Sequence, residues 1–150
     1  SFLHQKVVDT DHEIAKESEK TIAELVQQGG WSSFELYEHN ALASLIKKID
    51  SQILSTGGRT PLSAKNRSLI TTNCIVIYLK ASAETIISRL ESDPKSVTSR
   101  PALSKIISSI TEVLADRSPI YQSIADIVID VDSGSPEEIA KNIIKKLKDY

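Results

Sequence analysis

The chain has 150 residues, with 18 lysine and arginine residues, 20 aspartate and glutamate residues and a formal net charge of −2. This length is typical of one domain with a substantial core, and the nearly balanced charge argues against a general attraction to nucleic acid or to an anionic membrane. The single cysteine, Cys74, excludes a disulfide framework within the chain, and no apolar stretch reaches the roughly 18 residues of a membrane helix. We therefore expect a cytoplasmic protein with neither nucleic-acid nor membrane partners.

Strands and helices are predicted to alternate in the first half of the chain. Short β-branched or apolar runs predict strands over 6–8 and 52–55, and apolar residues at helical spacing predict helices over 11–18, 21–28, 31–49 and 64–71. The pair Gly29-Gly30 separates the second helix from the third, because glycine is unfavourable inside a helix. The residues 56–59 form a glycine-containing loop after the second strand.

The second half of the chain continues this alternation. The unbroken apolar run over 74–79 predicts a strand that is buried in a parallel sheet, and 127–130 is the last strand. Helices are predicted over 83–90, 103–116, 118–125 and 136–147, with Pro136 at the first helical position, and the polar residues 91–99 predict a mobile loop. Four strands alternating with helices indicate an α/β fold, a parallel sheet flanked by helices.

Two carboxylates follow the first predicted strand, in Val7-Val8-Asp9-Thr10-Asp11. Ligands of open α/β sheets bind just outside the carboxyl ends of the strands, where two acids can hold a metal ion or a polyol hydroxyl. The alternative is that Asp11 only caps the N-terminus of the following helix.

Five segments of the chain carry recognisable motifs. They are Val8-Asp9-Thr10-Asp11, Phe34-Glu35-Leu36-Tyr37-Glu38, Ser55-Thr56-Gly57-Gly58-Arg59, Arg100-Pro101-Ala102-Leu103 and Arg117-Ser118-Pro119-Ile120-Tyr121 with Ala125-Asp126. In order, these segments resemble the D-T-D, F-R-x-x-E, triple-glycine turn, R-P-x-L lid and R-x-P-L-Y…A-D motifs of the shikimate kinase family. The resemblance covers essentially the whole chain. It implies a P-loop kinase-type fold, one domain over 1–150 with a lid over about 91–103, and a monomer.

The family resemblance implies transfer of the γ-phosphoryl group of ATP to the 3-hydroxyl of shikimate, with Mg²⁺, in aromatic amino acid biosynthesis. On the acceptor side, Asp11 would orient the attacking hydroxyl, and Asp9 would hold the water shell of the magnesium ion. Gly57 and Gly58 would let the backbone approach the substrate. An ordinary turn is the alternative for these two glycines.

The resemblance also assigns roles to residues in the second half of the chain. Arg117 would clamp the shikimate carboxylate, and Arg100 would descend with the lid onto the transferring phosphoryl group. Arg89 and Pro136 would flank the adenine. As alternatives, Arg117 pairs with Asp116 or Asp126 on the surface, and Arg89 and Arg100 are solvated arginines.

The chain departs from the family in lacking a Walker A motif, because no G-x-x-x-x-G-K-[ST] occurs in these residues. In the family, the strand, loop and helix that carry this motif precede the D-T-D strand and span roughly 30 residues. That strand occupies the middle of a five-stranded sheet of order 2-3-1-4-5. We therefore expect an N-terminally incomplete domain whose two half-sheets have unpaired inner edges, and poor stability of these residues alone. Direct pairing of the strands at 52–55 and 74–79, or a second chain, would fill the gap.

Two further departures concern charge. Glu35 stands where the family has an arginine for the shikimate carboxylate, and Arg59 replaces the third glycine of the turn. Arg59 either blocks the pocket or supplies the positive charge lost at position 35. Two hypotheses follow: a shikimate kinase-type phosphotransferase, or a catalytically impaired relative that binds a shikimate-like acid or a protein partner.

Overall fold

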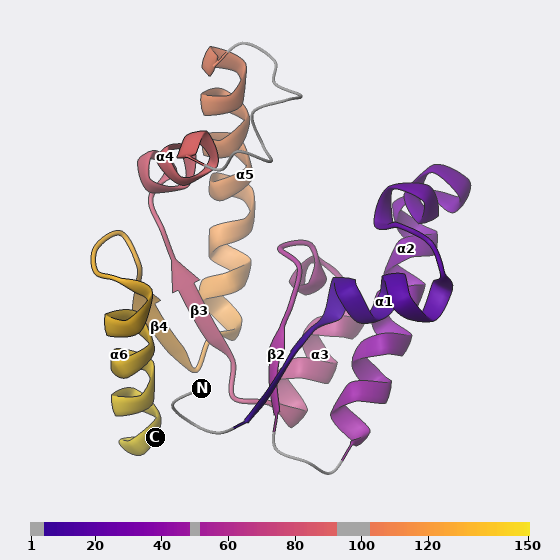
Figure 1. Ribbon diagram of the computed structural model, residues 1–150, viewed down its shortest axis with the longest axis horizontal. Helices are drawn as coiled ribbons and strands as arrows, with labels where there is room; N and C mark the ends of the chain where they lie inside the picture. Colours follow the sequence, from indigo (N-terminus) through magenta and orange to yellow (C-terminus); the bar gives the residue numbers. More distant parts are fainter. Residues whose placement is uncertain (1–4, 49–51, 93–102) are drawn as a thin grey trace. The chain divides into compact units, whose positions relative to one another are not determined.

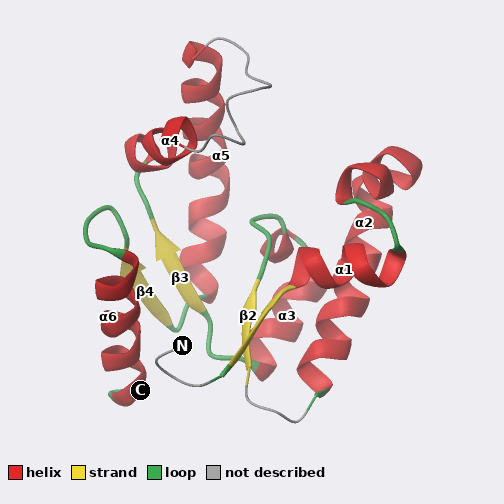
Figure 2. Ribbon diagram, viewed as in Figure 1, coloured by secondary structure: helices red, strands yellow, loops and turns green. Residues whose placement is uncertain are grey.

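The structure is a computed structural model that describes residues 5–48, 52–92 and 103–150 (Figure 1). The chain divides into two compact units, Ser1–Cys74 and Ile75–Tyr150. Each unit contains one two-stranded parallel sheet with helices packed against it (Figure 2). The predicted α/β class with parallel strands is confirmed.

Unit 1 is built on the parallel pair β1 (Lys6–Asp9) and β2 (Gln52–Ser55), in which Val8 lies opposite Leu54. Its other elements are α1 (Thr10–Ser18), α2 (Ile22–Lys47), the 3₁₀ helix η1 (Thr60–Leu62) and α3 (Ala64–Asn73). The core consists of Ile14, Leu25, Phe34 and Ala41, with Ile22 and Val26 packed against it. Val7 and Ile53 form a paired position on the other, exposed face of this sheet.

Glycine shapes the long helix α2 at the position that the sequence predicts. A capping box starts the helix, because the Thr21 side chain accepts from the Glu24 N–H and the Glu24 carboxylate accepts from the Thr21 N–H. Gly30 then has φ 69° and ψ 179°, outside the helical region, and kinks the helix. The predicted break is therefore confirmed at Gly30, where two helical stretches of α2 meet at the kink.

Unit 2 is built on the parallel pair β3 (Ile77–Lys80) and β4 (Ile127–Asp130). Its helices are α4 (Ala83–Ser92), α5 (Leu103–Ile124) and α6 (Pro136–Lys148). Buried Ile127, Ile129 and Val131 pack against Ile139, Ile143 and Leu147, which recur at helical spacing on α6. A second capping box, Ser135 with Glu138, starts α6 immediately before Pro136.

Two predicted boundaries and one prediction of burial are wrong. β3 begins at Ile77 rather than at Cys74, because the Cys74 N–H donates to the Ile70 carbonyl at 2.8 Å and closes α3. This strand is also not fully buried, since the Leu79 side chain is 52% exposed. The helix α5 runs through Pro119 without the predicted division. Beyond this proline, Tyr121 packs on Tyr78 of β3 with ring centroids 5.3 Å apart, which anchors the end of the helix.

The described strands pair as two separate halves, β1 with β2 and β3 with β4. This agrees with the prediction of two half-sheets.

Candidate functional site

Asp9 lies at the carboxyl end of β1 and caps α1. Its Oδ1 accepts a hydrogen bond from the His12 N–H at 3.1 Å, and its Oδ2 accepts from the Ser55 hydroxyl at 3.3 Å. Ser55 is also its partner in the register of the sheet. Asp9, and not Asp11, is therefore the N-cap, so the interpretation of Asp11 as a simple cap is wrong.

Asp11 lies in the first turn of α1, half-buried against the turn after β2. A Cβ atom at Gly57 would stand 3.3 Å from both carboxylate oxygens of Asp11, which is tighter than an ordinary contact. Burial raises the pKa of the Asp11 carboxyl, and the neighbouring carboxylate of Asp9 raises this pKa further. The structure thus brings together three of the predicted site residues: Asp9, Asp11 and Gly57.

A buried glutamate, Glu38, joins this turn to two helices. Its side chain on α2 is 3% exposed. Oε1 accepts from the Thr60 hydroxyl of η1 at 2.5 Å, and Oε2 accepts from the Asn66 amide of α3 at 2.9 Å. The Asn66 Oδ1 lies 2.9 Å from Nδ1 of His39. This network fixes the position of the residues that follow Gly57 and Gly58.

The charge of Glu38 is costly in this setting. Burial raises the pKa of its carboxyl, and the carboxylates of Asp11 and Glu35 raise this pKa as well. The hydrogen bonds from Thr60 and Asn66 act in the opposite direction. Sequence reasoning assigned no role to Glu38 and missed Thr60, Asn66 and His39. The available signal was the position of Glu38, four residues after Phe34 and four before Leu42, on the apolar face of α2.

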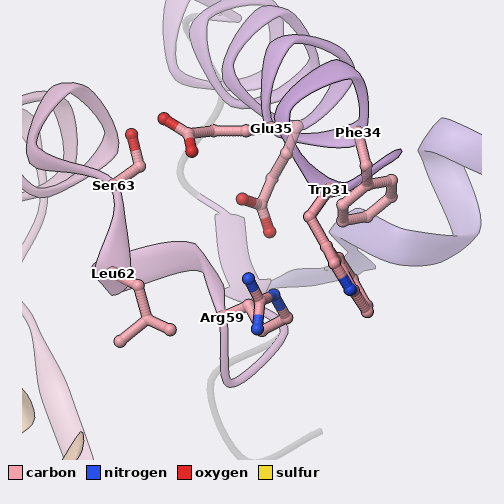
Figure 3. A pocket seen from close by; sticks show the side chains of 7 residues that line it. Trp31, Phe34, Glu35, Arg59, Leu62 and Ser63 are labelled. Atoms are coloured by element: carbon pink, nitrogen blue, oxygen red, sulfur yellow. The ribbon is translucent and has the colours of Figure 1, made fainter. Parts of the chain in front are cut away.

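Beside this network lies a cavity of about 30 Å³, lined by Trp31, Phe34, Glu35, Glu38, Arg59, Leu62 and Ser63 (Figure 3). The Arg59 guanidinium carbon stands 4.1 Å from the centre of the Trp31 ring, a cation–π contact worth about 0.5–1 kcal/mol at an exposed site. Trp31 in turn meets Phe34 edge to face, with ring centroids 6.0 Å apart. The Glu35 side chain is directed towards Arg59 (Figure 3).

The remaining predicted site residues belong to unit 2 or lie outside the described residues. The Arg89 guanidinium donates to the Val131 carbonyl, just after β4, and Pro136 is at the start of α6 in the same region of the chain. Arg117 is half-buried on α5. Arg100 and the predicted lid over about 91–103 lie largely outside the described residues.

In the ranges that the structure describes, no three His, Cys, Asp or Glu residues gather closely enough to bind a metal ion together. Among the described helices, none combines the length and the apolar character needed to cross a bilayer.

Comparison with known proteins identifies the family. The model of the family described as shikimate kinase matches residues 1–148. A shikimate kinase 2 from Photorhabdus laumondii subsp. laumondii is 41% identical over 139 residues, which cover 91% of this chain and 78% of that protein. The chain belongs to the shikimate kinase family. A second shikimate kinase 2, from Yersinia enterocolitica, is 35% identical over 149 residues, which cover 98% of this chain and 83% of the relative.

Solved structures show the shikimate kinase fold for this chain. The shikimate kinase from Acinetobacter baumannii in complex with shikimate aligns with a TM-score of 0.86 and 24% identity, over 99% of this chain and 81% of that one. The shikimate kinase from Bacteroides thetaiotaomicron aligns with a TM-score of 0.84 and 20% identity, over 99% and 86% of the two chains.

Proposed function

We propose that the chain acts as a shikimate kinase-type phosphotransferase, in which unit 1 binds shikimate and the γ-phosphoryl group of ATP passes to its 3-hydroxyl. The observation that carries this proposal is the half-buried Asp11 carboxylate, held against Gly57 at the carboxyl end of β1. Membership of the shikimate kinase family and the shikimate complex of the Acinetobacter baumannii relative support the choice of acceptor.

Asp11 is proposed to position and activate the attacking hydroxyl. Its carboxylate accepts a hydrogen bond from that hydroxyl, and it accepts the proton as the hydroxyl oxygen bonds to the γ-phosphorus of ATP and the bond from that phosphorus to the departing ADP breaks. The raised pKa of Asp11 suits this task, since a general base works best when its pKa approaches the working pH. Phosphoryl transfer depends mainly on positioning and charge neutralisation, the roles proposed here for Asp11 together with Arg100 and Arg117.

Asp9 and Asp11 are suited to a nearby magnesium ion. Burial and the carboxylate of Asp9 both raise the pKa of Asp11, and a divalent cation would relieve the repulsion between the two carboxylates. Mg²⁺ usually keeps several waters and takes few carboxylates, so Asp9 would hold it through its water shell. The ion would supply charge neutralisation for the phosphates of ATP. In unit 2, Arg89 and Pro136 are proposed to flank the adenine.

The alternative proposal is a catalytically impaired relative that binds a shikimate-like acid or a protein partner. One observation favours it: the cavity beside Asp11 has carboxylates of Glu35 and Glu38 in its lining.

Isothermal titration of the folded chain with shikimate, alone and with Mg·ATP, tests the proposal, and a coupled assay of ADP release tests turnover. Shikimate binding with phosphoryl transfer supports the phosphotransferase. Shikimate binding without transfer supports the impaired relative. A chain that is folded by circular dichroism and binds no shikimate contradicts acceptor binding by unit 1.

Gly57→Ala is expected to weaken shikimate binding several-fold while the fold is kept. The new Cβ would stand 3.3 Å from both Asp11 oxygens, so the carboxylate must shift away from its bound position. Calorimetric titration measures the loss. In an Asp11→Asn background the same substitution is expected to cost less, because the two residues act through one contact. Equal losses in both backgrounds would contradict this coupling.

A further inference from the structure

The cavity beside Asp11 is acidic apart from one residue. Glu35 and Glu38 contribute carboxylates to its lining, and Arg59 contributes the positive charge among the seven lining residues. The carboxylate of Asp11 is close enough to raise the pKa of Glu38. An anionic ligand that entered this region would therefore be repelled by three carboxylates and attracted by Arg59.

Arg59 is held in place from two sides. Its guanidinium stacks on Trp31, with 4.1 Å between the guanidinium carbon and the ring centre, and Phe34 supports Trp31 edge to face. Its backbone belongs to a fixed turn: the Thr60 N–H donates to the Gly57 carbonyl, and the Leu62 N–H donates to the Arg59 carbonyl. Stacking uses the flat face of a guanidinium, while its N–H groups donate in the plane of the group, the geometry that suits a carboxylate.

We infer that Arg59 binds the carboxylate of the acceptor and makes the site selective for an anionic acceptor, and that Glu35 competes with that carboxylate for the guanidinium. The inference rests on the proposed function, because it concerns the same acceptor. Figure 3 shows the Glu35 side chain directed towards Arg59 across the cavity, in the position of a competing anion.

The spacing in the turn fits an acceptor that carries hydroxyls at one end and a carboxylate at the other. A Cβ atom at Gly57 would stand 3.3 Å from the Asp11 carboxylate oxygens, and Arg59 follows two residues later. The turn closed by the hydrogen bond from the Thr60 N–H to the Gly57 carbonyl keeps these two positions close together. A ring acid can therefore place a hydroxyl at Asp11 and its carboxylate at Arg59.

The test compares shikimate with its uncharged methyl ester, by calorimetric titration of the full chain. The wild-type chain is expected to bind the acid about 10-fold or more tightly than the ester. Arg59→Gln is expected to reduce this preference by weakening the binding of the acid alone, and Arg59→Lys is expected to keep more of it. Glu35→Gln is expected to bind the acid several-fold more tightly. Lys47→Gln is the matched control, because it removes a cation from α2 at a point roughly 18 Å along the helix from Glu35. This variant is expected to leave the affinities for the acid and for the ester unchanged.

Trp31 provides a second readout, because it is the one tryptophan of the chain and stacks on Arg59. Shikimate is expected to change its fluorescence, and the methyl ester to change it much less.

Three outcomes would overturn the inference. An Arg59→Gln variant that keeps the preference for the acid would show that another residue binds the carboxylate, and it would leave the proposed function intact. An unchanged affinity in Glu35→Gln would overturn the competing role of Glu35. A folded wild-type chain that binds neither acid nor ester would overturn both this inference and acceptor binding by unit 1.

Discussion

Glu38→Ala is expected to lower the free energy of unfolding of unit 1 by about 2–4 kcal/mol. The substitution removes the acceptor of both the Thr60 hydroxyl and the Asn66 amide, and it leaves these buried donors without a partner. Each unsatisfied buried group costs about 1–3 kcal/mol, and the truncated side chain also leaves a cavity. Urea denaturation followed by Trp31 fluorescence measures the loss, since this single tryptophan lies in unit 1.

Glu38→Gln is a second variant that removes the charge of Glu38 without truncating the side chain. Glutamine keeps the shape of the side chain and can accept from Asn66 and donate to Thr60, so the network survives without the buried charge. Glu17→Ala on the exposed face of α1 is the control, and it is expected to change stability by less than about 0.5 kcal/mol. A Glu38→Ala variant as stable as this control would contradict the structural role of the network.

The pH dependence of stability separates charge from packing at Glu38. Because its pKa is raised in the folded state, the folded chain binds more protons than the unfolded chain between the ordinary pKa of glutamate and the raised value. Stability therefore falls as the pH rises through this window, and Glu38→Gln is expected to flatten that part of the profile. Asp11 contributes with the same sign, because its pKa is also raised.

Asp11→Asn is expected to weaken shikimate binding about 10- to 100-fold, because a hydrogen bond to a charged acceptor is worth about 1.5–3 kcal/mol. Where phosphoryl transfer is measurable, the rate is expected to fall about 10²- to 10⁴-fold, the usual contribution of a general base. Titration calorimetry and the coupled assay measure the two effects. Circular dichroism of the variant controls for folding.

The pH dependence of binding gives Asp11 a more specific signature. Shikimate binding that needs the ionised carboxylate weakens as the pH falls through the raised pKa of Asp11. Asp9→Asn removes one cause of that raised pKa, so it is expected to move the midpoint to lower pH. A midpoint that stays in place in both Asp9→Asn and Asp11→Asn would assign the titration to another group.

Local patterns in the sequence were sufficient to predict most of the secondary structure. Alternating strands and helices, the glycine break at Gly30 and the proline start at Pro136 depend on neighbouring residues, and the structure confirms them. The five motif segments were sufficient to predict the shikimate kinase family, and the comparison with the family model confirms this prediction. The division of the strands into two pairs also agrees with the prediction.

Competition between local structures could not be resolved from the sequence. Cys74 belongs to an apolar run that predicts a strand, but its N–H donates to the last turn of α3. The strand β3 therefore begins only at Ile77. From the sequence, only Asp11 was considered as the cap, although residue type suits Asp9 equally well. Asp9 became the N-cap because its carboxylate reaches the His12 N–H, while Asp11 turns against Gly57 of a different element.

The sequence by itself determined the family, the order of elements and the placement of Asp9, Asp11 and Gly57 near the ends of strands, because these follow from short-range patterns. The tertiary structure decided the Glu38 network and the stacking of Arg59 on Trp31. Both join residues more than 20 positions apart along the chain, and burial gives the Glu38 network its energetic weight. No periodicity or spacing in a single sequence contains that information.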